Sequence, residues 1–195
     1  MPGRYELIAA TESDEISGII GAAEKKFGAQ SFKTGEIFPG DSVPVLTASA
    51  KSDSMAVNIF VWGFQNFSND GLIINARSES VTEKPTFKES FAERRCVVPT
   101  TGFFEWKPNP SGRKTRYKFN LPAAAEVYCA AIWKVQDGKP RFVLLTADAN
   151  ESVAEVHDRM PIIIDRPLLK EWLNSPESAM EIMREPTPIL AGRTV

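Results

Sequence analysis

The stretch CVVPTTGFFEWK, residues 96–107, has the composition of a strand in a folded sheet. It is rich in β-branched and aromatic residues, which fit a pleated and half-buried surface. Near its end Glu105 is flanked by Phe104 and Trp106, and the two-residue period of a strand places it on the same face as Phe103. The stretch therefore predicts β-structure that carries a carboxylate among aromatic side chains.

Similar runs lie on both sides of this stretch. The segment MAVNIFVWGF, residues 55–64, alternates and is rich in β-branched and aromatic residues. Further strands are predicted at GLIINA (71–76), TRYKFNL (115–121), VYCAAIWKV (127–135) and RFVLLTA (141–147). The pair Asp137-Gly138 between the last two is a strong hairpin signal. Strands joined by tight turns favour a mainly antiparallel or mixed sheet, so the expected fold class is α+β.

Helical patterns are fewer. The segment TESDEISGIIGAAEKKFG, residues 11–28, predicts a helix with Thr11 as its cap and Gly28 as its stop. Its apolar stripe consists of Ile16, Ile19, Ile20, Ala23 and Phe27. Two shorter patterns follow at residues 150–157 and 166–183, whereas residues 33–48, rich in glycine and proline, indicate loop-like chain that leads into a strand.

Length and composition limit what the chain can be. With 195 residues, 43% hydrophobic and 25% charged, it predicts one domain, residues 1–195. It has neither an apolar run long enough to cross a bilayer nor a signal-peptide pattern, so we expect a cytoplasmic protein without membrane partners. Cys96 and Cys129 lie in apolar contexts that favour buried free thiols. A single histidine and the lack of a Cys-x-x-Cys motif predict no metal centre, and we expect no cofactor.

Charge is unevenly spread along the chain. The formal net charge of −2 argues against nucleic-acid binding, but residues 94–118 are strongly basic. This segment holds a single acid, Glu105, and the cations Arg94, Arg95, Lys107, Arg113, Lys114, Arg116 and Lys118. It is either a solvated loop and strand face or a local surface for phosphates.

Two polar groups are candidates for chemistry on the strands. Asn75 and Arg77 are two residues apart at a strand end, so both side chains point the same way and form a donor pair for an anion. Arg77 is otherwise only a solubilising charge. Glu105, if buried among its aromatic neighbours, has the raised pKa that a general acid or base needs near neutral pH. If its face is exposed, no such shift is expected.

The segments HDRMP and VWGF are two further candidates. His157 is the single histidine of the chain, and it precedes Arg159 and an extended step at Met160. A lone histidine is most often structural. Trp62 precedes Gly63 at a strand end, where a tryptophan is usually core but can also offer a flat stacking surface.

Taken in order, the motifs GRY, WGF, NARSE, RRCVVPTTGFFEWK and HDRMP closely resemble the SRAP family, named for SOS-response-associated peptidases. The resemblance runs from Gly3 to about Trp172. It implies an α+β fold around a twisted, barrel-like sheet with flanking helices. It also implies a groove for single-stranded DNA with an abasic site, covalent linkage to that site, and peptidase-like self-processing in the DNA damage response.

The resemblance also implies roles for single residues. Asn75, Glu105 and His157 match the active-site asparagine, glutamate and histidine of the family. The implied DNA contacts are Arg4, Arg77 and Arg159 at phosphates, Trp62 and Gly63 at an unstacked base, Pro39 lining the site, and Met160 beside Arg159. An opened abasic sugar presents an aldehyde, which needs an amine nucleophile, proton transfer, and donors for hydroxyl and phosphates.

The chain departs from the family at its second residue. The family starts Met-Cys-Gly-Arg, and loss of methionine leaves a cysteine whose amine and thiol close a stable ring with the aldehyde. This chain has Pro2 instead. If Met1 is removed, Pro2 carries a secondary amine that forms an iminium and favours strand cleavage by β-elimination. If Met1 stays, the same nitrogen is an inert amide.

Three functions therefore remain open from the sequence. The first is a SRAP protein that processes or shields abasic sites in single-stranded DNA and associates with the nucleoid when bound. The second is a non-catalytic module that binds single-stranded DNA. The third is an enzyme that uses the Pro2 amine on a small carbonyl compound, as tautomerases do. Neither a coiled coil nor an exposed apolar stripe is indicated, so we expect a monomer.

Overall fold

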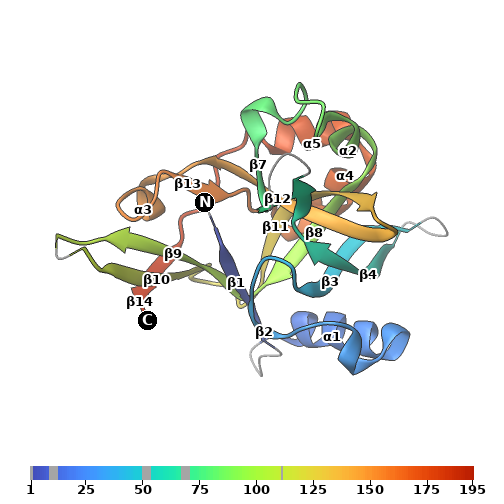
Figure 1. The fold of residues 1–195 in the computed structure, drawn as a ribbon, viewed down its shortest axis with the longest axis horizontal. Coiled ribbons are helices and arrows are strands. Elements are labelled where there is room, and N and C mark those ends of the chain that lie inside the picture. The colour runs from blue at the N-terminus through green and yellow to red at the C-terminus, as the bar shows by residue number, and fades with distance from the viewer. Residues whose placement is uncertain (1, 9–12, 50–53, 67–70, 111) are drawn as a thin grey trace.

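A closed barrel forms the centre of the molecule in a computed structural model, which describes residues 2–8, 13–49, 54–66, 71–110 and 112–195 (Figure 1). Five strands pair around it in the order β11, β8, β3, β4 and β12, and the pairing of β12 with β11 closes the ring. The strands are β3 (Ser42–Ala48), β4 (Met55–Trp62), β8 (Arg95–Thr100), β11 (Val127–Gln136) and β12 (Lys139–Asp148).

Two short strands extend the barrel through β12. These are β7 (Asn75–Arg77) and β13 (Arg159–Pro161). The pairs of β12 with β4 and with β7 are parallel, and the other pairs in this sheet are antiparallel. The β11–β12 connection has φ of 49° at Asp137 and 70° at Gly138, so the predicted hairpin turn is confirmed.

A second, antiparallel sheet of five strands packs beside the barrel in the order β14-β10-β9-β1-β2. Its strands are β1 (Arg4–Leu7), β2 (Gly35–Ile37), β9 (Gly102–Pro108), β10 (Lys114–Asn120) and β14 (Ala191–Thr194). A small pair, β5 (Phe64–Asn66) with β6 (Gly71–Ile73), completes the strands described. The stretch 96–107 thus forms two strands, β8 in the barrel and β9 in the second sheet, and Figure 1 shows the hairpin β9–β10 reaching away from the barrel.

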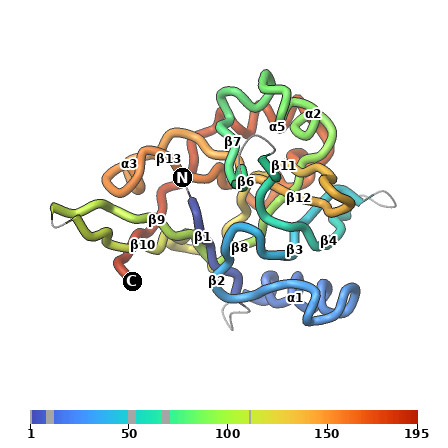
Figure 2. Tube along the Cα trace, in the orientation of Figure 1, coloured from blue at the N-terminus to red at the C-terminus, as the bar shows by residue number. Residues whose placement is uncertain are grey.

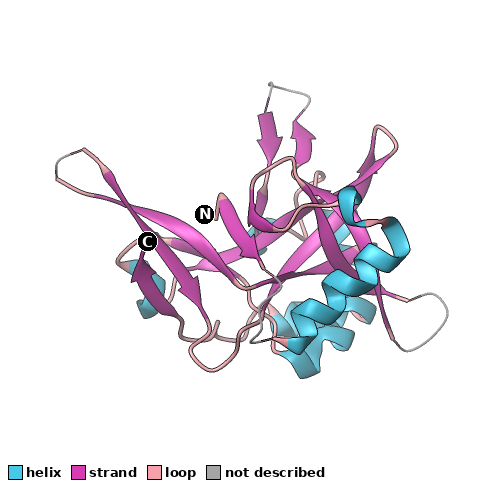
Figure 3. Ribbon diagram, turned by 90° about the horizontal axis from the view of Figure 1, so that it is seen from below, coloured by secondary structure: helices cyan, strands magenta, loops and turns pink. Residues whose placement is uncertain are grey.

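The helices lie outside the sheets, and Figure 3 shows most of them gathered away from the hairpin β9–β10. They are α1 (Asp14–Phe27), α2 (Lys88–Glu93), α3 (Glu151–Ala154), α4 (Leu169–Asn174) and α5 (Pro176–Ile182). Short 3₁₀ turns occupy Ala29–Ser31 (η1), Ser78–Ser80 (η2) and Arg166–Leu168 (η3). The expected α+β class with a barrel-like sheet is confirmed.

Helix α1 agrees with its predicted pattern, apart from its cap. Thr11 lies outside the described residues, and Ser13 caps the helix by accepting a hydrogen bond from the Ile16 N–H at 3.1 Å. Gly28 ends the helix with a φ of 86°. The pattern at 166–183 forms two helices because Ser175 accepts from the Ser178 N–H at 3.0 Å and Pro176 starts a new helix.

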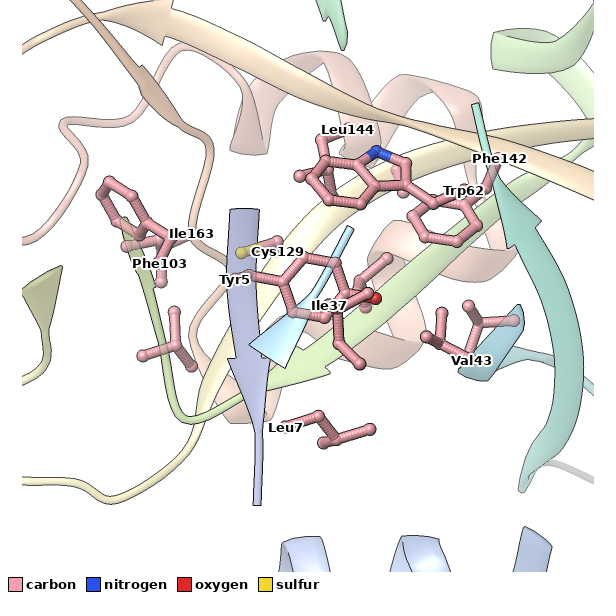
Figure 4. Close-up of a cluster of buried hydrophobic side chains, with 14 of the residues drawn as sticks. Tyr5, Leu7, Ile37, Val43, Trp62, Phe103, Cys129, Phe142, Leu144 and Ile163 are labelled. Carbon is pink, nitrogen blue, oxygen red and sulfur yellow. The ribbon is translucent and has the colours of Figure 1, made fainter. Parts of the chain in front are cut away.

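Both faces of the barrel strands are buried. One face packs against the second sheet and contributes Val43, Phe142 and Leu144 to a cluster with Tyr5 and Trp62 (Figure 4). The opposite face carries a second cluster, which includes residues of α2, α4 and α5. Cys96 and Cys129 are buried free thiols, as predicted, and burial raises the pKa of Cys129 to about 12. The core therefore holds the second sheet, and with it the start of β1, against the barrel.

Candidate functional site

A pocket of about 450 Å³ opens beside the N-terminal end of β1. It is formed by the chain before β1, by the hairpin β9–β10 and by the connection from α3 to β13, which lie together around the N-terminal end in Figure 2. Its lining residues are Gly3, Arg4, Glu105, Trp106, Lys114 and His157. The fold thus brings the two predicted proton-transfer residues to one pocket, although 52 positions of sequence separate them.

Asn75 links β7 to the chain that enters this pocket. Its Nδ2 donates to the carbonyl oxygen of Pro2 at 3.0 Å, and Pro2 is buried. The strand is held by parallel pairing of Asn75 with Leu144 of β12. Asn75 Oδ1 is buried and has no hydrogen-bond partner within the described part of the chain. Since an unsatisfied buried acceptor is unfavourable, a hydroxyl brought close to this oxygen would be stabilised.

Glu105 lies in the middle of β9 with its side chain buried. It is opposite Tyr117 of β10, and only 3% of its surface is exposed. Burial raises the pKa of Glu105. The prediction of a buried carboxylate among aromatic residues with a raised pKa is confirmed, and the solvent-exposed alternative is wrong.

His157 follows α3 and faces two partners through one ring nitrogen. Its Nδ1 lies 3.0 Å from the backbone N–H of Arg159 and 2.8 Å from Oδ1 of Asp158. A neutral Nδ1 accepts the first hydrogen bond, whereas a protonated Nδ1 donates to the carboxylate. The side chain is 31% exposed and lines the pocket beside β1.

Arg4 stands at the edge of the pocket beside aromatic rings. Its guanidinium contacts Glu36 at 3.1 Å and lies over the rings of Phe38 and Trp106, with centroid distances of 4.4 and 5.2 Å. Its side chain is 38% exposed. A cation held over aromatic faces yet open to solvent is suited to meet a phosphate.

Arg77 and Pro39 lie outside the residues that line the pocket. Arg77 ends β7, two residues after Asn75, and is exposed while Ala76 between them is buried. Pro39 is half-buried in the turn between β2 and β3, next to Gly40, which has a φ of 93°. Of the two, Arg77 shares the short strand that holds Pro2.

Trp62 and Gly63, predicted to meet an unstacked base, are both buried in this structure. The Trp62 indole is fully buried between the rings of Tyr5 and Phe142, at centroid distances of 5.0 and 6.4 Å (Figure 4). Its Nε1–H donates to the carbonyl of Ile74 at 3.0 Å. Gly63 is also buried, with a φ of 107°. Trp62 is thus a core residue here, and its polar atom is satisfied by the protein itself.

Arg159 also differs from its predicted role as a phosphate contact. It is 6% exposed, and its guanidinium binds the carboxylates of Glu79 and Asp148 and the carbonyl of Thr146 at 2.7 Å. The hydrogen bonds from Arg159 lower the pKa of Glu79 to about 2. Two carboxylates already pair with this cation, so a phosphate would have to displace one of them for the predicted contact to form.

Met160, predicted beside the DNA, is a core residue. Its side chain is fully buried, and its sulfur accepts from the backbone N–H of Asn150 at 3.3 Å. It therefore supports the α3–β13 connection that carries His157.

The basic segment divides into structural and accessible cations. The buried Arg95 donates to carbonyls at the ends of α2 and α4, those of Phe91, Ala92, Trp172 and Leu173, at 2.6 to 3.2 Å. Arg94 binds Glu89 at 2.5 Å, and Lys118 binds Glu6. The exposed or half-exposed cations on the hairpin β9–β10 are Lys107, Arg113, Lys114 and Arg116. Arg94, Arg95 and Lys118 thus have structural partners, and a phosphate-binding surface on the hairpin stays a prediction.

Two lining residues were not singled out from the sequence. Trp106 was noted only as a neighbour of Glu105, and Lys114 only as one charge in the basic run. The two-residue alternation of β9 places Trp106 on the opposite face from Glu105, so no pattern in the sequence indicated that both line one pocket. For Lys114, its position at the start of β10 depends on the hairpin pairing.

Among the described residues no group of three or more histidine, cysteine or acidic side chains could hold a metal ion. No helix in the described part of the chain is long and apolar enough to cross a membrane.

Solved structures share this fold. A crystal structure of a protein from Bacteroides thetaiotaomicron superposes with a TM-score of 0.77 at 21% identity, covering 99% of this chain and 91% of the other. A phage-related protein from Bordetella bronchiseptica gives a TM-score of 0.73 at 23% identity, covering 99% and 93%. At these identities the likeness establishes the fold alone.

Two similar proteins are both described as abasic site processing proteins. Abasic site processing protein YoaM of Bacillus subtilis is 33% identical over 117 residues, 57% of this chain and 52% of that protein. Abasic site processing protein YedK of Escherichia coli is 24% identical over 150 residues, 74% of this chain and 66% of that protein. The chain thus spans about half the length of the first of these relatives. The family model of the SOS response associated peptidases (SRAP) matches residues 1–191, and the chain therefore belongs to the SRAP family.

Proposed function

We propose that this protein recognises abasic sites in single-stranded DNA at the pocket beside β1. The observation that carries the proposal is the meeting of Glu105 and His157 in one pocket with the chain that follows Pro2. Arg4 and Lys114 line the same pocket and supply positive charge for the phosphates on either side of a missing base. The relatives described as abasic site processing proteins support the same substrate.

The pocket has the groups that imine chemistry on an opened sugar requires. Glu105, with its raised pKa, holds a proton closer to neutrality than an ordinary carboxyl does, and can pass it to the aldehyde oxygen. His157 lines the same pocket, where an imidazole can serve as the second proton-transfer group. Asn75 Oδ1 is the acceptor that would orient a sugar hydroxyl.

Pro2 decides whether recognition becomes a covalent bond. When Met1 is absent, the secondary amine of Pro2 attacks the aldehyde carbon, and the carbonyl oxygen leaves as water after it gains protons. The product is an iminium, because the proline nitrogen has no further proton to lose. Loss of the neighbouring C2′ proton then expels the 3′ phosphate by β-elimination. Pro2 offers no thiol, so the stable ring of an N-terminal cysteine cannot close.

A DNA-binding module without chemistry is the second candidate. The observation in its favour is that Pro2 is buried and its carbonyl is already held by Asn75, which restricts approach to the adjoining nitrogen. In this case the same cations bind the strand, and Glu105 and His157 only shape the pocket.

Borohydride reduction distinguishes the two candidates. Purified protein, shown by intact mass to lack Met1, is incubated with an abasic single strand and reduced. A trapped protein–DNA adduct that maps to Pro2 supports the covalent function. Binding without any adduct supports the module, and equal affinity for abasic and intact strands contradicts abasic-site recognition in both forms.

A further inference from the structure

A second hollow, here called the acidic groove, lies at the helical side of the molecule. It has a volume of about 440 Å³ and is bounded by η3, α4, α5 and the chain that follows α5. Ile163 and Ile182 are buried at its floor, and Leu168, Pro186 and Pro188 contribute further apolar surface. It shares no lining residue with the pocket beside β1.

Carboxylates surround this apolar floor. Asp165, Glu171, Glu181 and Glu185 all line the acidic groove and are all exposed. None of them forms an ion pair within the described residues, and no lysine, arginine or histidine is among the lining residues. Four negative charges in one groove exceed the net charge of −2 of the whole chain.

The charges determine what class of molecule fits. A nucleic acid and an anionic lipid surface both carry negative charge and would be repelled. A bare cation has no reason to prefer carboxylates arranged around isoleucine, leucine and proline. An apolar centre with a charged rim is instead the anatomy of a protein-binding site, where the apolar anchor supplies affinity and the rim charges select the partner.

We propose that the acidic groove binds a cationic segment of a partner protein, with one or two aliphatic side chains in the groove and lysine or arginine on either side. The exposed Leu168 and the buried Ile182 contact the aliphatic anchor. Glu181 near the end of α5 and Glu185 in the chain that follows both line the groove and accept the flanking cations. Because this site is separate from the pocket beside β1, the partner and DNA can be bound together.

The test begins with selection of displayed random peptides on the full-length protein, with excess single-stranded oligonucleotide present to occupy the DNA-binding surface. We expect enrichment of aliphatic residues flanked by lysine or arginine. The Kd of an enriched peptide should rise about tenfold or more in the double variant Glu181→Lys and Glu185→Lys, because both rim charges become repulsive. Leu168→Asp should have a similar effect, and Leu168→Met should not.

A matched control carries the same change in net charge elsewhere. Glu24 and Glu83 are exposed and outside the acidic groove, so Glu24→Lys with Glu83→Lys should leave the peptide Kd within about twofold. Failure to enrich any basic motif, or equal binding to both double variants, overturns the proposal. The proposal is also overturned if sedimentation shows that the wild-type protein is a dimer and that Glu181→Lys with Glu185→Lys makes it a monomer. The occupant of the groove is then a second copy of the chain.

Discussion

Asn75 Nδ2 and the carbonyl oxygen of Pro2 lie 3.0 Å apart, although 73 positions of sequence separate the two residues. This hydrogen bond fixes the start of the chain to β7, and β7 is fixed in turn to the barrel strand β12. The N-terminal segment is thereby held where Glu105 and His157 line the pocket.

The first prediction concerns this hydrogen bond. Asn75→Ala should lower the yield of borohydride-trapped adduct by about tenfold, because the N-terminal segment loses its anchor and a positioned nucleophile depends on its orientation. The free energy of unfolding should fall by only about 1 kcal/mol, the usual effect of one hydrogen bond. Asn174→Ala, which removes an exposed side-chain hydrogen bond to the Lys170 carbonyl away from the pocket lining, should leave trapping unchanged. Equal trapping in both variants would contradict the anchoring role.

The second prediction concerns Glu105 and pH. A carboxyl whose pKa is raised in the folded state gives stability that is complete at acid pH and is lost as the pH rises through its folded pKa. Glu105→Gln should therefore unfold at a higher temperature than the wild type at pH 7, and the difference should vanish below about pH 4.3, the usual glutamate pKa.

The same variant should be a poor catalyst. Trapping on an abasic strand should slow by about 10²-fold, the common effect of removing a general acid or base. We therefore expect Glu105→Gln to have a higher unfolding temperature at pH 7 and a lower rate of adduct formation than the wild type. If Glu105→Gln forms the trapped adduct as fast as the wild type, Glu105 does not take part in the chemistry.

The third prediction concerns Glu79 and Arg159. Because Arg159 lowers the pKa of Glu79 to about 2, the pair stabilises the protein above the ordinary carboxyl pKa, and this stability is lost as the pH falls toward 2. Glu79→Gln should therefore reduce stability in urea at pH 7 more than at pH 3. Glu79 is about half exposed, so we expect a loss of about 1 kcal/mol or less. An equal loss at both pH values would mean that the ion pair contributes little.

The fourth prediction concerns binding to DNA. Affinity for a short abasic single strand should fall by about tenfold or more between 50 and 200 mM salt, because several phosphate contacts release counterions. Arg77→Ala and Lys114→Ala should each remove one phosphate contact. The slope of log K against log salt should therefore become shallower by about 1 in each variant. Arg95→Ala should leave this slope unchanged and lower the thermal stability, because its guanidinium binds helix-end carbonyls. A flat salt response would contradict the proposed function.

The fifth prediction concerns Pro2 itself. Pro2→Cys, confirmed by mass to lack Met1, should form an adduct that survives heating without borohydride, because the thiol can now close a ring with the sugar. The native chain should give a labile adduct and some strand cleavage. One residue added before Pro2 should abolish both reactions by acylating the amine, and salt-sensitive binding should persist. If the cysteine variant forms no stable adduct, the remaining site residues do not support the chemistry.

Local patterns in the sequence were sufficient for much of the fold. The period of α1, the hairpin turn at Asp137 and Gly138, and the strand that carries Glu105 were all predicted. These features depend on residues a few positions apart, whose backbone preferences and apolar spacing act within one element. The burial of Glu105 also followed, because its aromatic neighbours belong to the same strand.

The partners of individual side chains were decided by tertiary structure alone. Trp62 and Arg159 have the residue types of a stacking surface and a phosphate contact, yet the fold buries the first between Tyr5 and Phe142 and pairs the second with Glu79, 80 positions away. A sequence shows which side chains can stack or carry charge, but not which distant residues become their contact partners in the folded protein. That outcome depends on how the sheets pack and pair. The second sheet brings Tyr5 onto Trp62, and the pairing of β7 and β13 with β12 brings Glu79 to Arg159, so buried charges and polar atoms are satisfied there.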